Sequence, residues 1–209
     1  MIKAVIFDVD GVLIDSFEAN LQFYHDLFVN AGYPPLSREK FIFHMTMDKI
    51  IREHTQLKDE NKIKQIWQMG KDCRYPDELV ISPKNYDTVV RELSKKYTLG
   101  IATSRVYGGV FKLKQLSGLE NLFKTAVYFE DTEKHKPDPE PLLLASQRLA
   151  VPPGESVYIG DTDTDIQAAK AAGMSVIAFS KSKLEGADAV TDSFDDIPKL
   201  IKNIGDTLE

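Results

Sequence analysis

The sequence contains very little cysteine and no long apolar run. Cys73 is the single cysteine among 209 residues, so an internal disulfide is excluded, and this usage fits a reducing compartment such as the cytoplasm. No apolar run approaches the roughly 18 residues of a membrane span, and the N-terminus lacks a basic stretch followed by a long apolar one. We therefore expect a soluble cytoplasmic protein with no membrane partner.

Concentrated positive charge is also missing. Lysine and arginine number 26 against 32 aspartate and glutamate residues, which gives a net charge of −6, and no basic run occurs. Nucleic-acid backbones and anionic lipid surfaces require clustered lysine and arginine. The composition therefore argues against a nucleic-acid partner.

Several common ligand-binding motifs are absent. The sequence has neither a GxxxxGK[ST] phosphate loop nor a GxGxxG dinucleotide fingerprint. A calcium loop starting at Asp161 fails, because Ile166 stands at its sixth position where glycine is needed. Nucleotide binding through these loops and calcium binding of this type are excluded.

Short apolar runs rich in β-branched residues alternate with helical patterns along most of the chain. Five runs predict strands that are buried on both faces: KAVIFDV, YTLGIATS, TAVYFE, SVYIGD and MSVIAFS. Helices are predicted at 86–97, at EPLLLASQRLA and at TDIQAAKAAG. This alternation predicts an α/β fold with a Rossmann-like, doubly wound parallel sheet, in which ligands bind beyond the carboxyl ends of the strands.

One stretch, residues 18–77, breaks this alternation. It carries only helical signals, including FIFHMTMDKIIREH and NKIKQIWQM. The chain is therefore expected to contain an α/β catalytic core, residues 1–15 and 81–209, and a small all-helical cap domain, residues 16–80, inserted after the first strand. The two connections are expected to lie close in space and to form a hinge, with the insertion acting as a lid.

Acidic and hydroxyl residues gather where the predicted strands end. They are Asp8, Asp10, Thr103, Ser104, Asp161 and Asp165, with Lys136 just before a predicted helix. Two carboxylates about 4 Å apart repel by roughly 4 kcal/mol at an effective dielectric near 20. The group Asp8, Asp10 and Asp161 therefore predicts a cation among them, and hard oxygen ligands favour Mg²⁺.

Four segments, in this order, resemble the motifs of the haloacid dehalogenase-like hydrolase superfamily: DVDGV, IATS, KPDPEP and GDTDTD. The helical insertion after the first motif resembles the cap of the phosphoglycolate phosphatase and β-phosphoglucomutase branch. Each motif alone is weak, but four in order near strand ends are specific. The resemblance implies a Mg²⁺-dependent phosphatase that hydrolyses a small phosphorylated metabolite through an aspartyl-phosphate intermediate.

The resemblance also assigns roles to individual residues. Asp8 would be the nucleophile, and Asp10 would protonate the leaving group and then take a proton from the hydrolytic water. Asp8, Asp161 and the backbone carbonyl of Asp10 would hold the metal ion, with Asp165 orienting a metal-bound water. Lys136 would neutralise charge on the nucleophile and on the transferring phosphoryl group.

Phosphate oxygens would be held by the second and first motifs. The Thr103 hydroxyl and the backbone N–H of Ser104 would bind them, and Gly11 would let the chain turn so that a backbone N–H faces the phosphate. Asp10 also speaks against dehalogenase activity, because the dehalogenases of the superfamily lack this second aspartate.

Ordinary structural roles stay open for several of these residues. Asp165, at the start of a predicted helix, is also suited to helix capping, and so are Thr103 and Ser104. Lys136, which precedes Pro137, would ordinarily be a solvated lysine, although the four motifs together favour a functional role. Arg105 is a further candidate for contact with a substrate anion. In the insertion, substrate contact or plain packing is open for His44, Met45, Thr46 and Lys49.

Two other functions are compatible with this sequence. A phosphomutase of the β-phosphoglucomutase type shares the core residues and passes the phosphoryl group to a sugar instead of water. A non-catalytic, phosphate-responsive binding protein would also gather aspartates around Mg²⁺, although Asp10 has no role in mere binding. The sequence leaves the metabolite and the oligomeric state open.

Overall fold

The computed structural model describes residues 1–43 and 45–207. The chain divides into two compact units, a core unit formed by residues 1–15 and 81–209 and a helical unit formed by residues 16–80. At the boundary, Asp15 and Ile81 exchange two backbone N–H···O hydrogen bonds of 2.8 and 2.9 Å. The two chain connections therefore run side by side, as the sequence predicts.

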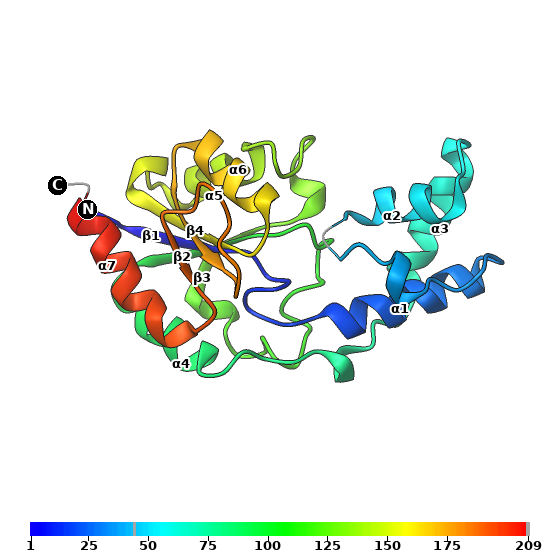
Figure 1. The fold of residues 1–209 in the computed structure, drawn as a ribbon, viewed down its shortest axis with the longest axis horizontal. Helices are drawn as coiled ribbons and strands as arrows, with labels where there is room; N and C mark the ends of the chain where they lie inside the picture. Colours follow the sequence, from blue (N-terminus) through cyan, green and yellow to red (C-terminus); the bar gives the residue numbers. More distant parts are fainter. Residues whose placement is uncertain (44, 208–209) are drawn as a thin grey trace. The chain divides into compact units, whose positions relative to one another are not determined.

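The core unit is built on a six-stranded parallel sheet with the order β3-β2-β1-β4-β5-β6 (Figure 1). The strands are β1 (Ala4–Phe7), β2 (Thr98–Ala102), β3 (Phe123–Val127), β4 (Ser156–Gly160), β5 (Ser175–Phe179) and β6 (Ala189–Thr191). Strands β1 to β5 are the five predicted runs, and β6 is an additional edge strand. The doubly wound parallel sheet is confirmed.

Strand β1 lies at the centre of the sheet, where the winding changes direction. Its first residue, Ala4, pairs with Thr98 of β2 on one side and with Ser156 of β4 on the other. All four residues of β1 are buried, as expected for a strand covered on both faces. A ligand of such a sheet binds at this switch point, beyond the carboxyl ends of β1 and β4.

Four α-helices cover the two faces of the sheet (Figure 1). They are α4 (Tyr86–Leu93), α5 (Glu140–Leu149), α6 (Asp163–Ala172) and α7 (Ile197–Thr207). Helix α5 packs on β1, β2 and β3, and α6 packs on β4 and β5, whereas α4 and α7 pack together on the opposite face. Leu142 and Ala145 of α5 and Ala169 of α6 enclose the main core with Ile6 and Tyr158 of the sheet.

The connection between β2 and β3 departs from the strand–helix alternation. Residues 103–119, all of which the structure describes, form turns and no α-helix. Gly108 and Gly118 have φ values of +78° and +82°, in the left-handed region that interrupts a right-handed helix. The alternative that Thr103 and Ser104 cap a helix is therefore wrong.

The helical unit contains α1 (Phe17–Asn30), α2 (Met47–Thr55) and α3 (Glu60–Asp72), and its described residues include no strand. Its own core joins Leu27 and Phe28 of α1 to residues of the other two helices, Ile50, Ile51, Ile63 and Ile66. Helix α2 begins later than the sequence predicts. The rings of Phe41 and Phe43 instead pack against Phe17, with centroids 5.4 Å away in both cases.

The insertion residues considered for substrate contact are placed as follows. His44 lies outside the described residues. Met45 packs against the core of the helical unit, Thr46 precedes α2, and Lys49 is exposed on that helix. Within the described parts of the chain, no helix has both the length and the apolar character that a membrane crossing needs.

Candidate active site

Asp8 stands directly after β1, at the switch point of the sheet. Its backbone N–H donates to the Ile159 carbonyl at 2.8 Å, which extends the pairing of β1 with β4 by one residue. Its side chain is buried, and the N–H of Val9 donates to Oδ1 at 2.7 Å. The other carboxylate oxygen, Oδ2, accepts from Nζ of Lys136 at 2.8 Å. The Asp8 carboxylate is therefore held in one orientation at the rim of the sheet.

Lys136 is buried and makes three polar contacts. Its side chain is 8% exposed, and Nζ donates to Asp8, to Oδ1 of Asp165 at 2.7 Å and to the Tyr158 hydroxyl at 3.0 Å. Three donors on one ammonium thus meet three acceptors from different elements. The alternative of a solvated lysine is wrong.

The pKa values of the three charged side chains in this network are shifted in different directions. Burial would lower the pKa of Lys136, but Asp165 and Asp8 hold it well above its ordinary value. Burial would raise the pKa of Asp165, but the charge and hydrogen bond of Lys136 hold it below its ordinary value. Burial raises the pKa of Asp8 to about 7, against the opposing effect of Lys136. Lys136 and Asp165 therefore form a charged pair, and Asp8 competes for the same ammonium.

Asp161 follows β4 and completes a group of carboxylates. One oxygen from each of Asp8, Asp161 and Asp165 lies within 4.8 Å of the other two. Burial and the negative charges of Asp8 and Asp165 raise the pKa of Asp161 to about 9. A bound cation would lower the pKa values of these carboxylates, so the group is suited to hold a cation.

Gly11 is required where it stands for two reasons. Its φ is +77°, and a Cβ placed on it would lie 1.8 Å from Oδ2 of Asp161. Its own N–H donates to the Ile14 carbonyl at 2.8 Å, so a backbone donor for phosphate would have to come from a neighbouring residue. Gly11 therefore makes room for the Asp161 carboxylate within a tight turn.

Asp10 does not join the three-carboxylate group, in contrast to the expectation that its carboxylate lies among them. Arg105 holds it instead, with Nε donating to Oδ2 at 2.8 Å and Nη2 donating to Oδ1 at 2.7 Å. The two neighbouring aspartates of the DVDG segment thus each have their own cation, Lys136 for Asp8 and Arg105 for Asp10. Asp165 takes the third place in the group.

Asp165 has structural partners for both of its oxygens. It stands in the first turn of α6, where Thr162 is the N-cap and the two side chains form a capping box. Its Oδ2 accepts from the Thr162 hydroxyl at 2.6 Å and from the N–H of Asp161 at 3.2 Å. Its Oδ1 accepts from Lys136 and Tyr158. The capping role is confirmed, and Asp165 contacts Lys136 directly.

Thr103 and Ser104 follow β2, next to β1. Thr103 is buried, its N–H donates to the Val127 carbonyl at 3.0 Å, and its hydroxyl accepts from the N–H of Arg105 at 3.2 Å. Ser104 is exposed. The same short segment thus carries the two residues expected to bind phosphate and the arginine that holds Asp10.

Tyr158 is a site residue that the sequence analysis does not identify. It is fully buried in β4, and its hydroxyl donates to Oδ1 of Asp165 at 3.0 Å or to the Ala102 carbonyl at 3.2 Å while accepting from Lys136. The available signal is a tyrosine inside a run that predicts a buried strand, SVYIGD, because a buried hydroxyl needs a polar partner.

A sequence model of the haloacid dehalogenase-like hydrolase family matches residues 5–179. The chain belongs to this family. The matched range contains every residue of the site described above, and it ends at the last residue of β5.

Individual relatives cover nearly the whole hydrolase. Pyrophosphatase PpaX of Bacillus cereus strain B4264 is 32% identical over 224 residues, with 97% of this chain and 98% of the relative covered. Among solved structures, a HAD-superfamily hydrolase of subfamily IA, variant 1, from Geobacter sulfurreducens is 28% identical with a TM-score of 0.75, covering 96% and 100% of the two chains. CbbY of Rhodobacter sphaeroides, solved with phosphate, is 22% identical with a TM-score of 0.81, covering 94% and 96%, and shares the fold.

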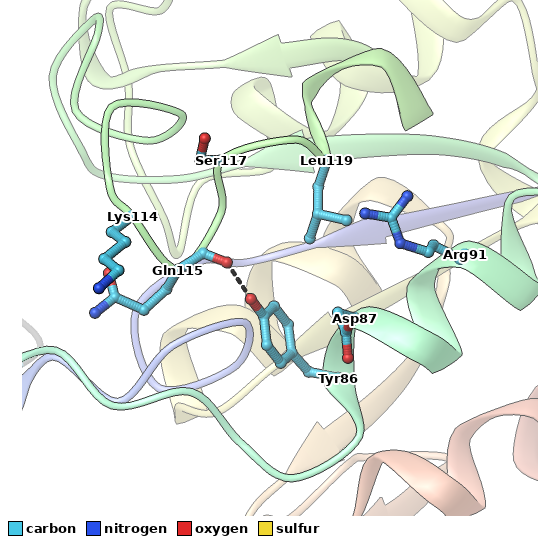
Figure 2. Close-up of a pocket in the computed structure, with 7 residues that line it drawn as sticks. All are labelled: Tyr86, Asp87, Arg91, Lys114, Gln115, Ser117 and Leu119. Carbon is cyan, nitrogen blue, oxygen red and sulfur yellow. Dashed lines mark hydrogen bonds between the residues drawn. The ribbon is translucent and has the colours of Figure 1, made fainter.

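The core unit of the hydrolase also has a separate hollow of about 380 Å³ beside α4 (Figure 2). Its lining residues are Tyr86, Asp87, Arg91, Lys114, Gln115, Ser117 and Leu119. None of them belongs to the carboxylate site. Figure 2 shows Tyr86 pointing to the backbone of Gln115, to whose carbonyl its hydroxyl donates.

Proposed function

We propose that this hydrolase is a Mg²⁺-dependent phosphatase that hydrolyses a small phosphorylated metabolite through a phosphorylated Asp8. The observation that carries the proposal is the position of the Asp8 carboxylate and the charged groups around it. It lies at the switch point of the sheet, paired with the buried ammonium of Lys136, with oxygens of Asp161 and Asp165 within 4.8 Å. A carboxylate fixed beside a cation and a metal-ligand set is suited to phosphoryl transfer, which depends mainly on positioning and charge neutralisation.

The residues present fit a magnesium ion. The group offers only hard carboxylate oxygens, which Mg²⁺ prefers, and no histidine or cysteine is part of it. Asp8 and Asp161 would hold the ion together with the backbone carbonyl of Asp10. Asp165 would stay with Lys136, because both of its oxygens already have protein donors. When bound, the ion would neutralise negative charge on the phosphoryl oxygens.

The chain's own residues then divide the reaction into two steps. Asp8 attacks phosphorus, and a bond forms between its carboxylate oxygen and phosphorus. The ester bond to the leaving oxygen breaks while Asp10, starting in its protonated form, gives that oxygen its proton and becomes a carboxylate. Water next attacks phosphorus, Asp10 takes a proton from it, and the bond to Asp8 breaks to release phosphate. Lys136 balances charge on Asp8 in both steps, and the Thr103 hydroxyl and the Ser104 N–H would hold phosphate oxygens.

Inorganic pyrophosphate is the first substrate to test. The relatives that carry the name pyrophosphatase PpaX are 32% identical and extend over nearly the whole chain. The helical unit, residues 16–80, is proposed as the cap domain of the enzyme. A sugar phosphomutase would use the same residues of the core unit, so sugar phosphates belong in the same panel, with isomerisation measured beside phosphate release.

The test is release of inorganic phosphate from a panel of pyrophosphate, sugar phosphates and other phosphorylated metabolites, with Mg²⁺ and with a chelator. We expect Mg²⁺-dependent turnover of at least one member. Asp8→Asn should abolish it and remove the phosphate adduct that mass spectrometry detects on Asp8 in acid-quenched wild type. Asp163→Asn is the matched control, because Asp163 is an exposed aspartate at the start of α6, two residues from Asp161, and its turnover should be unchanged.

Two results would overturn the proposal. One is a folded wild-type protein that releases no phosphate from any member of the panel. The other is full turnover by Asp8→Asn, which would remove Asp8 as the nucleophile. Stable phosphorylation of Asp8 without release would instead support the phosphate-responsive binding protein.

A further inference from the structure

The pair formed by Asp10 and Arg105 is a two-point contact in a partly enclosed position. Each oxygen of the carboxylate accepts from a different nitrogen of the guanidinium, at 2.8 and 2.7 Å. The side chains are 25% exposed for Asp10 and 11% exposed for Arg105. Bidentate pairs of this kind fix the plane of the carboxylate as well as its distance.

Arg105 is itself anchored at several points. Its third guanidinium nitrogen, Nη1, donates to the Gly109 carbonyl at 3.1 Å. Its backbone N–H donates to the Thr103 hydroxyl at 3.2 Å, and its carbonyl accepts from the N–H of Phe129 at 2.9 Å. The arginine is therefore held by the β2–β3 connection and by the segment that follows β3, and the Asp10 side chain takes its orientation from the arginine.

The Asp10 carboxylate stays partly exposed beside the guanidinium of Arg105. The quarter of the Asp10 side chain that is exposed is consistent with a further partner on the open side. Without the arginine, the negative charge of Asp8 would push the Asp10 carboxylate away, and its torsion would be free to rotate.

We infer that Arg105 is a positioning residue that aims the Asp10 carboxylate at the leaving group. The inference rests on the proposed function, because Arg105 would act through the proton that Asp10 transfers in that reaction. Direct binding of a substrate anion by Arg105 is the competing role, although three of the five guanidinium N–H groups already have protein acceptors. The two roles predict different kinetics when Arg105 is removed. Positioning predicts a fall in kcat that depends on the leaving group, whereas direct binding predicts an equal loss for all substrates.

The experiment compares substrates whose leaving groups need a proton to different degrees. Alkyl phosphates leave as basic alkoxides and depend on an acid, whereas 4-nitrophenyl phosphate leaves as a stable anion. In Arg105→Ala, kcat should fall about 100-fold for the alkyl phosphate, the effect of a small misplacement of a reacting group, with KM little changed. For 4-nitrophenyl phosphate, kcat should fall by less than about 10-fold.

Further variants separate positioning from general damage. Arg105→Lys keeps the charge without the two-point geometry and should recover only part of the alkyl phosphate activity. Asp10→Asn should show the same dependence on the leaving group, and adding Arg105→Ala to it should cause no further loss. Arg148→Ala is the matched control, because it removes another arginine–aspartate pair of the core unit, Arg148 with Asp131 at 2.8 Å, and it should keep wild-type turnover.

The outcomes are distinct. Equal loss across the substrate series with raised KM would assign Arg105 to direct substrate binding and overturn the inference. Unchanged kcat in both Arg105 variants would overturn it as well, while leaving the proposed function intact. A wild type that turns over neither this series nor the metabolite panel would overturn the proposed function and the inference together. Circular dichroism of each variant verifies the fold, and Arg105→Lys decides the question if Arg105→Ala does not fold.

Discussion

The aspartates at positions 8 and 10 draw their counter-ions from different parts of the chain. Lys136 lies 128 residues from Asp8, and Arg105 lies 95 residues from Asp10. Separate cations on separate loops hold the two carboxylates apart, Asp8 within the group of three carboxylates and Asp10 outside it. The repulsion that the sequence implies between them is thus offset by protein groups as well as by any bound ion.

Tyr158→Phe tests the support of Lys136 at this scale. The change keeps the buried ring but removes the hydroxyl that accepts from Lys136 at 3.0 Å. Because a buried charged group loses a hydrogen-bond partner, the free energy of unfolding should fall by about 2 kcal/mol, and kcat should fall with it. Urea titration and steady-state kinetics measure the two effects.

Tyr86→Phe is the control for this prediction. The Tyr86 hydroxyl also donates within the core unit, but its acceptor is the uncharged backbone carbonyl of Gln115 (Figure 2). It should lose about 1 kcal/mol of stability and no activity. Equal kinetic behaviour of the two variants would contradict the role given to Tyr158.

At the scale of elements, the N-terminus of α6 couples helix capping to the site. Thr162 accepts from the N–H of Asp165 at 3.2 Å and donates to Oδ2 of the same residue at 2.6 Å. Thr162→Ala should therefore reduce the free energy of unfolding by about 1 kcal/mol and should lower turnover by loosening Asp165 and Lys136. Thr162→Ser keeps the hydroxyl and should restore both quantities. Wild-type turnover in a destabilised Thr162→Ala protein would contradict this coupling.

The strands of the core unit are predictable because their burial leaves a clear pattern. Strands β1, β2, β4 and β5 are largely buried, and four-residue β1 is buried throughout, whereas β3 is exposed at Lys124. Strand β6 has only three residues at the sheet edge and no apolar run of its own. The start of α2 is missed for a different reason. Phe41 and Phe43 continue the apolar pattern, but tertiary packing of their rings against Phe17 decides their conformation.

At the scale of the whole molecule, topology explains which part of the site is predictable. Parallel strands end at one rim, so Asp8, Thr103 and Asp161 can be placed there from the sequence alone. Their partners cannot, because Lys136 and Arg105 stand on irregular segments whose side-chain directions have no periodicity. Gly11 shows the same limit, since its turn is predictable and its closeness to Asp161 is not.

Magnesium binding should stabilise the core unit and leave the helical unit unaffected. The group of three carboxylates belongs wholly to the core unit, and each unit has its own hydrophobic core. At 100 times its dissociation constant, a ligand that binds only the native state stabilises it by about 2.7 kcal/mol. Hydrogen exchange with and without Mg²⁺ should therefore show added protection around the ends of β1 and β4, with no change in α1, α2 and α3.

Asp161→Asn supplies the comparison for this effect. The amide is close in size to the carboxylate but carries no charge, so it relieves repulsion with Asp8 and Asp165 while weakening the bond to a cation. The variant should fold as well as the wild type in chelator and should gain little stability from Mg²⁺. An equal Mg²⁺ response in wild type and variant would place the ion elsewhere on the molecule and would remove Asp161 from the metal site.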